Sequence, residues 1–259
     1  MPELLKMSIS SLPVWERNIM DALLNQFIKE MRKFISHHTL ENEMVSVFAR
    51  PLTPEEAIGR PAHDDYPLLK GKERIMQAVF QDVKGHAYSD HTGNFYGSLS
   101  QVINLPMDSN FHRALFIATA NAVLRKIGII KKSCHCKDDD PVTCATHLKD
   151  ALLPFLPKRI GMIGHQPRLL EEVLRNFEVR ICDRDPEKID TIQSGVTIED
   201  SSVYEDIKKW ADLILVTGTT LVNNTIDSFT GSVPIIFYGI TISGAAKLLH
   251  LHHFCPLGR

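Results

Sequence analysis

The segment Ser133–His147 has the clearest capacity for chemistry, because it holds three of the chain's 5 cysteines, two histidines and three consecutive carboxylates. In an extended segment, the thiols of Cys134 and Cys136 point to one side and the imidazole of His135 to the other. Thiolates and imidazole together suit zinc, copper(I) or another soft metal ion. The spacing Cys-x-Cys-x7-Cys-x2-His differs from the paired Cys-x2–4-Cys knuckles of standard zinc sites, so this pattern is not a zinc finger or ribbon.

A helix is expected to follow these thiols. Asp138 to Asp140 supply capping carboxylates, and Pro141 suits the first turn of a helix. Cys144 would then lie near the helix N-terminus, where the dipole lowers a thiol pKa. His147 follows three residues later, on the same face. The alternative is that these cysteines are free, half-buried thiols with no ligand role.

A second set of polar residues falls in two loops of the first half of the chain. The segment 59–73 combines prolines, glycines and charges of both signs, which is typical of a functional loop, and the segment 85–90 contains His86 and Asp90. An imidazole and a carboxylate can transfer protons, with Lys72 as a third catalytic candidate. Arg60 and Lys70 could bind an anionic substrate.

The composition restricts the class of protein. The chain has 259 residues, 44% of them hydrophobic, and a net charge of -2 without a Lys/Arg block, which argues against nucleic-acid binding. We see no secretory signal and no apolar run long enough to span a membrane. An odd number of cysteines fits a reducing compartment. We therefore expect a cytoplasmic protein, and the base rate for such proteins favours a homodimer.

The first half of the chain has the pattern of an α+β domain that ends near the prolines at 154 and 157. Asn121 lies in its most apolar helix, where the amide needs either a core hydrogen bond or a pocket. The pattern predicts a strand at 44–49 and helices at 13–36, 72–81, 98–105, 111–127 and 141–153.

The second half alternates short apolar strands with helices, which predicts a doubly wound parallel sheet. We divide the chain into domains at 1–155 and 156–259. The expected strands are 159–163, 179–182, 196–198, 213–216 and 234–238, and the expected helices are 168–175, 203–210, 221–229 and 244–251. The last segment, 250–255, is either a further metal ligand set or a closing strand.

Ligands of such sheets bind beyond the carboxyl ends of the strands. Candidates there are Gly164, Asp183, the turn Thr217-Gly218-Thr219-Thr220, Asn223, Gly239 and Thr241. Asp183 stands where a ribose-binding carboxylate would lie, but the first turn lacks the Gly-x-Gly-x-x-Gly fingerprint of dinucleotide sites. The threonine turn could hold an anion through N–H groups and hydroxyls, or could simply cap a helix.

A series of motifs runs through the chain: Ile58-Gly-Arg-Pro61, Asp65-Tyr-Pro-Leu68, Gly71-Lys-Glu73, Gly85–Asp90, Asn121-Ala122, His135-Cys-Lys-Asp138, Gly164-x-Gln-Pro167, Thr217-Gly-x-Thr220, Asn223 and Gly239-x-Thr241. Taken together, these motifs resemble a family described as a heavy-metal chelation domain and catalogued as domain of unknown function 364. The resemblance implies a first domain similar to the enolase N-terminal cap, a Rossmann-like second domain and a site between them. We take Arg60, Asp65, Lys70 and Asn121 as the candidates for substrate contacts. This chain departs from the family in having His86, Tyr88, Ser89 and His165.

Three functions follow from these observations. The first is a metal-binding or metal-handling protein that holds a soft or borderline ion, or a metal-bound small molecule, between the domains. His135, Cys136, Asp138 and Cys144 are the ligand candidates. The second is a metal-independent enzyme acting on a small phosphorylated or carboxylated metabolite. The third is a nucleotide- or adenosylmethionine-binding module that uses Asp183.

Overall fold

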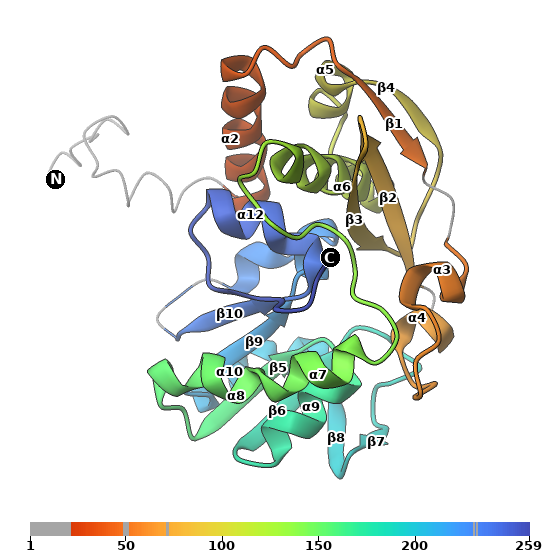
Figure 1. Cartoon of the computed structure of the whole chain (residues 1–259). Coiled ribbons are helices and arrows are strands. Elements are labelled where there is room, and N and C mark those ends of the chain that lie inside the picture. The colour runs from red at the N-terminus through yellow and green to blue at the C-terminus, as the bar shows by residue number, and fades with distance from the viewer. Residues whose placement is uncertain (1–21, 49–51, 71–72, 230, 232) are drawn as a thin grey trace, which may run out of the picture.

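The computed structural model describes residues 22–48, 52–70, 73–229, 231 and 233–259, and it contains two sheets (Figure 1). One is a four-stranded antiparallel sheet with the order β3-β2-β1-β4, and the other is a seven-stranded, mostly parallel sheet with the order β11-β10-β9-β5-β6-β8-β7. The predicted mixed α/β class is therefore confirmed. Within the described residues, no helix combines the length and the apolar character needed to cross a bilayer.

The four-stranded sheet forms a layer against helix α6. Gly85 of β3 permits this packing, because a Cβ atom there would lie 2.2 Å from the main-chain oxygen of Ala118 on α6. The strands are β1 (Met44–Phe48), β2 (Arg74–Phe80), β3 (Val83–Ser89) and β4 (Phe95–Ser98), and the helices are α2 (Leu23–His37), α3 (Pro54–Ile58), α4 (Pro67–Lys70), α5 (Leu99–Ile103) and α6 (Asn110–Lys126).

Several expectations for this half are confirmed and two are wrong. The helices at 98–105 and 111–127 are present as α5 and α6, capped by the side chains of Ser98 and Ser109. The expected helix at 72–81 is instead strand β2, and the expected loop at 85–90 is strand β3. A short apolar run does not distinguish the two structures, and pairing with β3 along the whole of β2 decides for the strand. Of the helix expected at 13–36, residues 13–21 lie outside the described residues.

The seven-stranded sheet contains the five predicted parallel strands and one short strand at each edge. The predicted strands are β5 (Arg159–Ile163), β6 (Glu178–Asp183), β8 (Val196–Asp200), β9 (Leu213–Thr217) and β10 (Ile235–Tyr238). At the edges, β7 (Ile192–Gln193) pairs antiparallel with β8, and β11 (His253–Phe254) pairs parallel with β10. The chain builds outward from β5 through β6 to β8, then returns to the other side of β5 and continues through β9 and β10. The strand order therefore reverses between β5 and β9.

Helices cover both faces of this sheet. Ile160 and Met162 of β5 lie in one hydrophobic cluster with residues of α8 and α9, whereas a Cβ atom at Gly161 would meet Ile207 of α10 on the opposite face. The helices are α7 (Asp140–Thr146), α8 (Leu148–Leu152), α9 (Pro167–Leu174), α10 (Tyr204–Trp210), α11 (Thr219–Val222) and α12 (Ser243–Leu248), with 3₁₀ turns η2 (Leu153–Phe155), η3 (Ser201–Val203), η4 (Ile226–Phe229) and η5 (Ile240–Ile242).

Two helices expected as continuous are interrupted. The helix at 141–153 divides into α7 and α8 at His147. The helix at 221–229 divides into α11 and η4, and Asn224 between them has a positive φ of 54°. Such a φ cannot continue an α-helix. The chain therefore bends between α11 and η4.

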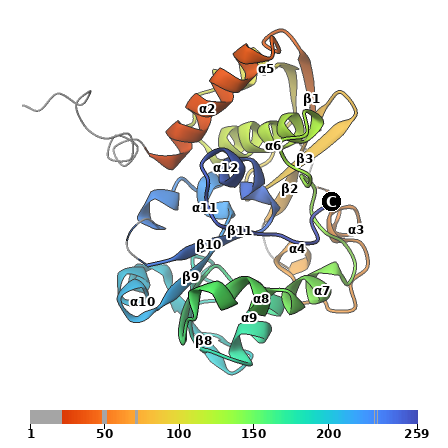
Figure 2. The ribbon, with the colours of Figure 1, turned by 60° about the vertical axis from the view of Figure 1, so that its left-hand side comes forward.

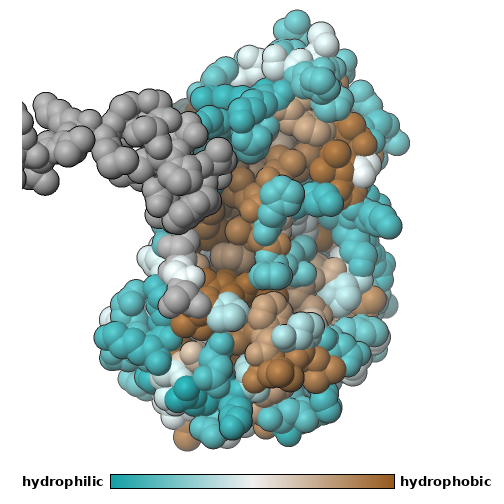
Figure 3. All heavy atoms as spheres, turned by 90° about the vertical axis from the view of Figure 1, so that its left-hand side faces the viewer, coloured by the Kyte–Doolittle hydropathy of each residue, from teal (hydrophilic) through white to brown (hydrophobic). Residues whose placement is uncertain are grey.

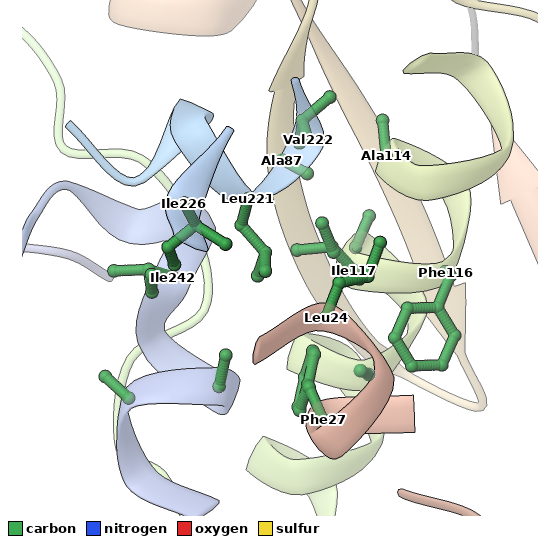
Figure 4. Packing of buried hydrophobic residues seen from close by; sticks show 14 of the residues in the cluster. Leu24, Phe27, Ala87, Ala114, Phe116, Ile117, Leu221, Val222, Ile226 and Ile242 are labelled. Atoms are coloured by element: carbon green, nitrogen blue, oxygen red, sulfur yellow. The ribbon is translucent and has the colours of Figure 1, made fainter. Parts of the chain in front are cut away.

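One hydrophobic cluster extends across both halves of the chain (Figure 4). Leu24 and Phe27 of α2 and Ile117 of α6 lie beside Leu221 of α11 and Ile226 of η4, and all five are buried. In Figure 2 the helices α11 and α12 lie between the upper helices and the seven-stranded sheet below. Figure 3 shows the face on the left of Figure 1, where apolar residues gather over the middle and right of the view. The division into domains at residue 155 stays a prediction. The hydrophobic cluster contains residues from both sides of this boundary.

Candidate functional site

A pocket of about 630 Å³ lies between the two sheets and is lined by residues of both. From the seven-stranded sheet it takes the loops that follow β5, β6, β9 and β10, including the edge between β5 and β9 where the strand order reverses. From the first half it takes Tyr66, Glu73, Tyr88 and Asp90. Its volume is in the range of small-molecule sites, and its position is the one at which open α/β sheets bind ligands.

All residues expected to bind a cofactor line this pocket. They are Gly164, Asp183, Thr217, Gly218, Thr219, Thr220, Asn223, Gly239 and Thr241. The structure brings them together because they follow neighbouring parallel strands, whose carboxyl ends meet at one edge. Their assignment to a cofactor is a prediction that the geometry leaves open.

The polar groups at this edge mostly bond to one another. Both oxygens of the Asp183 carboxylate accept hydrogen bonds from backbone N–H groups: Oδ2 from His165 at 2.7 Å, and Oδ1 from Arg184 at 2.7 Å and Asp185 at 3.0 Å. Asp183 therefore braces two loops, and this argues against the expected ribose contact. In the threonine turn, the hydroxyls of Thr217 and Thr219 lie 2.7 Å apart and share a hydrogen bond.

Three thiols and an imidazole lie near one another in the pocket lining. His135, Cys136 and Cys144 come from the segment singled out in the sequence, and Cys255 comes from the tail after β11. We call this set the thiol end. The Cys136 sulfur lies 4.0 Å from Nε2 of His135. Cys134 is not among the lining residues, and its thiol faces the carbonyl oxygen of Lys84 at 3.4 Å.

The thiols of this end are held in the neutral form. Burial raises the pKa of Cys144 to about 12 and that of Cys255 to about 11, and it raises the pKa of Cys136 as well. The neighbouring thiols add to the rise at Cys136 and Cys144. The expectation that the helix N-terminus lowers the pKa of Cys144 is wrong, because α7 is a helix of 7 residues and burial outweighs its dipole.

The imidazole of His135 is also neutral. Burial lowers its pKa to about 4, although main-chain groups of Cys136 and Ala57 favour the protonated ring. Its buried Nδ1 has no hydrogen-bond partner among the described residues. A neutral imidazole with an open nitrogen is the form that binds metals.

Asp138 does not join the thiol end, contrary to the expectation that it is a metal ligand. It is exposed and absent from the pocket lining. Its Oδ1 accepts a hydrogen bond from the backbone N–H of Arg60 at 2.9 Å, and its own N–H donates to the carbonyl of Ile58. Gly59 is required at this contact, because a Cβ atom there would lie 2.2 Å from Oδ1. Asp138 thus closes the loop that follows α3.

His86 and Asn121 are buried outside the pocket lining. Nδ1 of His86 accepts a hydrogen bond from the N–H of His135 and Nε2 lies 3.0 Å from Oε1 of Gln77, so both ring nitrogens are engaged. Asn121 donates to the carbonyls of His86 and Thr241 and accepts from the N–H of Gly244. Neither side chain is available to a ligand in the pocket, which argues against the expected catalytic and substrate roles.

The remaining candidate site residues differ in whether they line the pocket. Asp90 lines the pocket; burial would raise its pKa, but hydrogen bonds from Asn110 and His91 outweigh burial and lower it. Arg60 is exposed and pairs with Glu55, and Asp65 pairs with Arg168. Neither lines the pocket. Lys72 lies outside the described residues, and for Lys70 only the backbone position at the end of α4 is described.

Sequence reasoning missed Glu73 as a site residue. Glu73 lines the pocket, and burial raises the pKa of its carboxyl group to about 7; Lys188 opposes the rise, and Asp183 and Asp90 add to it. Tyr66 and Tyr204 were also missed. Both line the pocket and are buried, and neither hydroxyl has a hydrogen-bond partner among the described residues. Tyr66 and Glu73 lie in motifs of the family resemblance, but nothing in those motifs shows that the two side chains face a pocket with Tyr204, because the pocket is formed by residues distant in sequence.

Comparison with known proteins gives a family for the second half of the chain. Residues 154–254 match the family model DUF364, which is described as "Putative heavy-metal chelation". Over these residues the chain is similar to the DUF364 family. The resemblance predicted from the motifs is thereby confirmed over these residues. No curated protein matches the sequence.

Two solved structures of DUF364 proteins with unknown function are similar to the chain. The one from Pyrococcus horikoshii has 15% sequence identity and a TM-score of 0.53, and the match covers 85% of this chain and 79% of that chain. The one from Desulfitobacterium hafniense DCB-2 has 14% identity and a TM-score of 0.48, with 88% and 82% covered. The first match shows a shared fold that extends beyond the DUF364 segment. The enolase-cap-like and Rossmann-like labels stay predictions.

The described residues do not form a closed site for a bare metal ion. No group of three or more His, Cys, Asp or Glu side chains in the described ranges converges on one point as a ligand set. A structural metal site needs about four ligands at 2.0–2.3 Å. Within the thiol end, the imidazole of His135 and the thiol of Cys136 are adjacent and can contribute ligands to a metal ion.

Proposed function

We propose that this chain binds a small molecule that carries a heavy-metal ion, in the pocket between the two sheets. The observation that carries the proposal is the size of the pocket. At about 630 Å³ it is far larger than an ion requires and is suited to a small organic molecule. The family description names a heavy metal as the ligand. Because the described residues form no closed ligand set, we expect the small molecule to provide most of the ligands of the metal ion.

In this proposal, the thiol end provides the contact to the metal and the strand-end loops bind the organic part. Cys136 and His135 are adjacent, and soft donors of this kind favour soft or borderline ions. Because the thiols are neutral, coordination through Cys136 or Cys144 must release a proton. Binding should therefore weaken as the pH falls.

Equilibrium dialysis with elemental analysis tests the proposal on protein purified without a histidine tag. The probes are Ni²⁺ and Cu²⁺, each supplied as the aquo ion and as its complex with free histidine. We expect about one complex retained per chain, and at least tenfold weaker retention of the aquo ions. Equal retention of the two forms contradicts the chelate proposal, and retention of neither contradicts metal handling.

Cysteine variants provide the control. Cys136→Ser and Cys144→Ser should each reduce retention of the complex about tenfold, because each removes a thiol that lines the pocket. Cys134→Ser changes a neighbouring thiol that does not line it and should retain the complex like the unaltered protein. An equal loss in all three variants indicates unspecific thiol binding.

A further inference from the structure

A second set of pocket-lining residues consists of aromatic and hydroxyl side chains. It is formed by Tyr204, Phe229, Ser201, Thr225 and Ser228, and we call it the Tyr204 arm. Tyr204 begins α10, Phe229 ends η4, and Ser201 and the bend at Thr225 follow the carboxyl ends of β8 and β9. The interruption between α11 and η4 thus places Thr225 and Ser228 at the pocket.

Two buried rings form the wall of this arm. The rings of Tyr204 and Phe229 lie with centroids 4.5 Å apart at an interplanar angle of 71°, and each residue is only 7% exposed. Lys208 Nζ lies 5.8 Å from the centroid of the Tyr204 ring, so a third aromatic group would pack against the remaining ring face or the ring edges. Aromatic groups prefer offset-stacked and edge-to-face arrangements.

The hydroxyl of Tyr204 is buried without a hydrogen-bond partner among the described residues. Burial keeps it protonated by raising its pKa, so it can donate a hydrogen bond. A buried hydroxyl without a hydrogen-bond partner destabilises the folded protein. A ligand with a ring nitrogen or a carbonyl oxygen would relieve this.

We propose that the Tyr204 arm binds a planar nitrogen heterocycle, which packs against the Tyr204 and Phe229 rings and accepts a hydrogen bond from the Tyr204 hydroxyl. The proposal rests on the proposed function, since the heterocycle would be the organic part of the metal-bound molecule. It does not require the ribose contact expected of Asp183, whose two carboxylate oxygens already accept backbone hydrogen bonds.

Saturation-transfer NMR with metal-free probes tests it on the full chain. The probes are nicotinamide, adenine, guanosine and pterin, and each is compared with cyclohexanol and ribose, which lack an aromatic ring. We expect at least one heterocycle to bind and the ring-free compounds not to bind. Because no metal is present, failure here leaves the test of metal-complex retention untouched.

Variants then locate the binding. Tyr204→Phe removes only an unpaired hydroxyl and should keep the fold while weakening the best heterocycle about tenfold. Phe229→Leu should weaken it by several fold through loss of ring contact. Tyr96→Phe, at a residue 73% exposed, is the control and should change nothing. The proposal is wrong if no heterocycle binds, if Tyr204→Phe binds like the unaltered protein, or if Tyr66→Phe causes the loss in its place.

Discussion

At the scale of single residues, Glu73 is the pocket side chain whose charge changes near neutral pH. Its pKa is raised from an ordinary value of 4.5 to about 7, first by burial and then by Asp183 and Asp90. Between these two pH values the folded protein holds a proton that the unfolded chain has released. Stability must therefore fall as the pH rises from about 4.5 to about 7.

Glu73→Gln should remove this dependence. At each pH, the unfolding free energy of the variant is compared with that of the unaltered protein. This difference should shift in favour of the variant by about 2–3 kcal/mol between pH 5 and pH 8. Urea unfolding at the two pH values measures the difference. The exposed Glu178→Gln serves as the control and should show no such change. A constant difference between Glu73→Gln and the unaltered protein would show that Glu73 titrates normally.

Asn121 and Thr119 provide a matched pair on α6. Both are buried, but Asn121 bonds to main-chain groups of His86, Thr241 and Gly244, whereas the Thr119 hydroxyl has no partner among the described residues. Asn121→Ala should lower the unfolding free energy by about 3 kcal/mol because it leaves those groups unpaired. Thr119→Val should be neutral or stabilising. Thermal and urea unfolding test both variants. A small effect of Asn121→Ala would contradict a stabilising role for the hydrogen bonds of Asn121.

At the scale of elements, side-chain carboxylates of the segment before α7 accept hydrogen bonds from backbone N–H groups of the loop after α3. Asp138 accepts from the N–H of Arg60 at 2.9 Å, and Asp139 accepts from the N–H of Ala62 at 3.1 Å. These bonds connect the loop of the first half to the segment that carries the thiol end. They explain why Asp138 stands near Cys136 in sequence without lining the pocket.

Asp138→Ala should free the amide of Arg60 and increase its hydrogen exchange at least tenfold, whereas Asp138→Asn keeps an acceptor oxygen and should retain protection. Hydrogen exchange read by NMR at Arg60 distinguishes the two variants, with Ala62 as the internal reference. If Asp138 is a metal ligand after all, Asp138→Asn will reduce metal-complex retention while the loop stays protected.

At the scale of the whole molecule, the core that joins α2 and α6 to α11 and η4 determines how the chain unfolds. Leu221, at 0% exposure, lies in this core. Leu221→Ala should lower the unfolding free energy by about 2–5 kcal/mol, and both sheets should unfold in one transition. Far-UV circular dichroism and calorimetry test this, with Ile192→Ala, at 71% exposure, as the control. Two separated transitions would show that the halves are independent.

The sequence by itself determined the parallel strands, α5, α6 and the strand-end loops that line the pocket, because each depends on local periodicity and capping. It failed at β2 and β3, where antiparallel pairing decided the conformation. At the thiol end it identified His135, Cys136 and Cys144. It could not show that Cys255 joins them while Asp138 turns away to Arg60, nor that burial keeps the thiols neutral. Only the tertiary structure decided these points, because desolvation and the approach of Glu73, Tyr66 and Tyr204 depend on residues far apart in the chain.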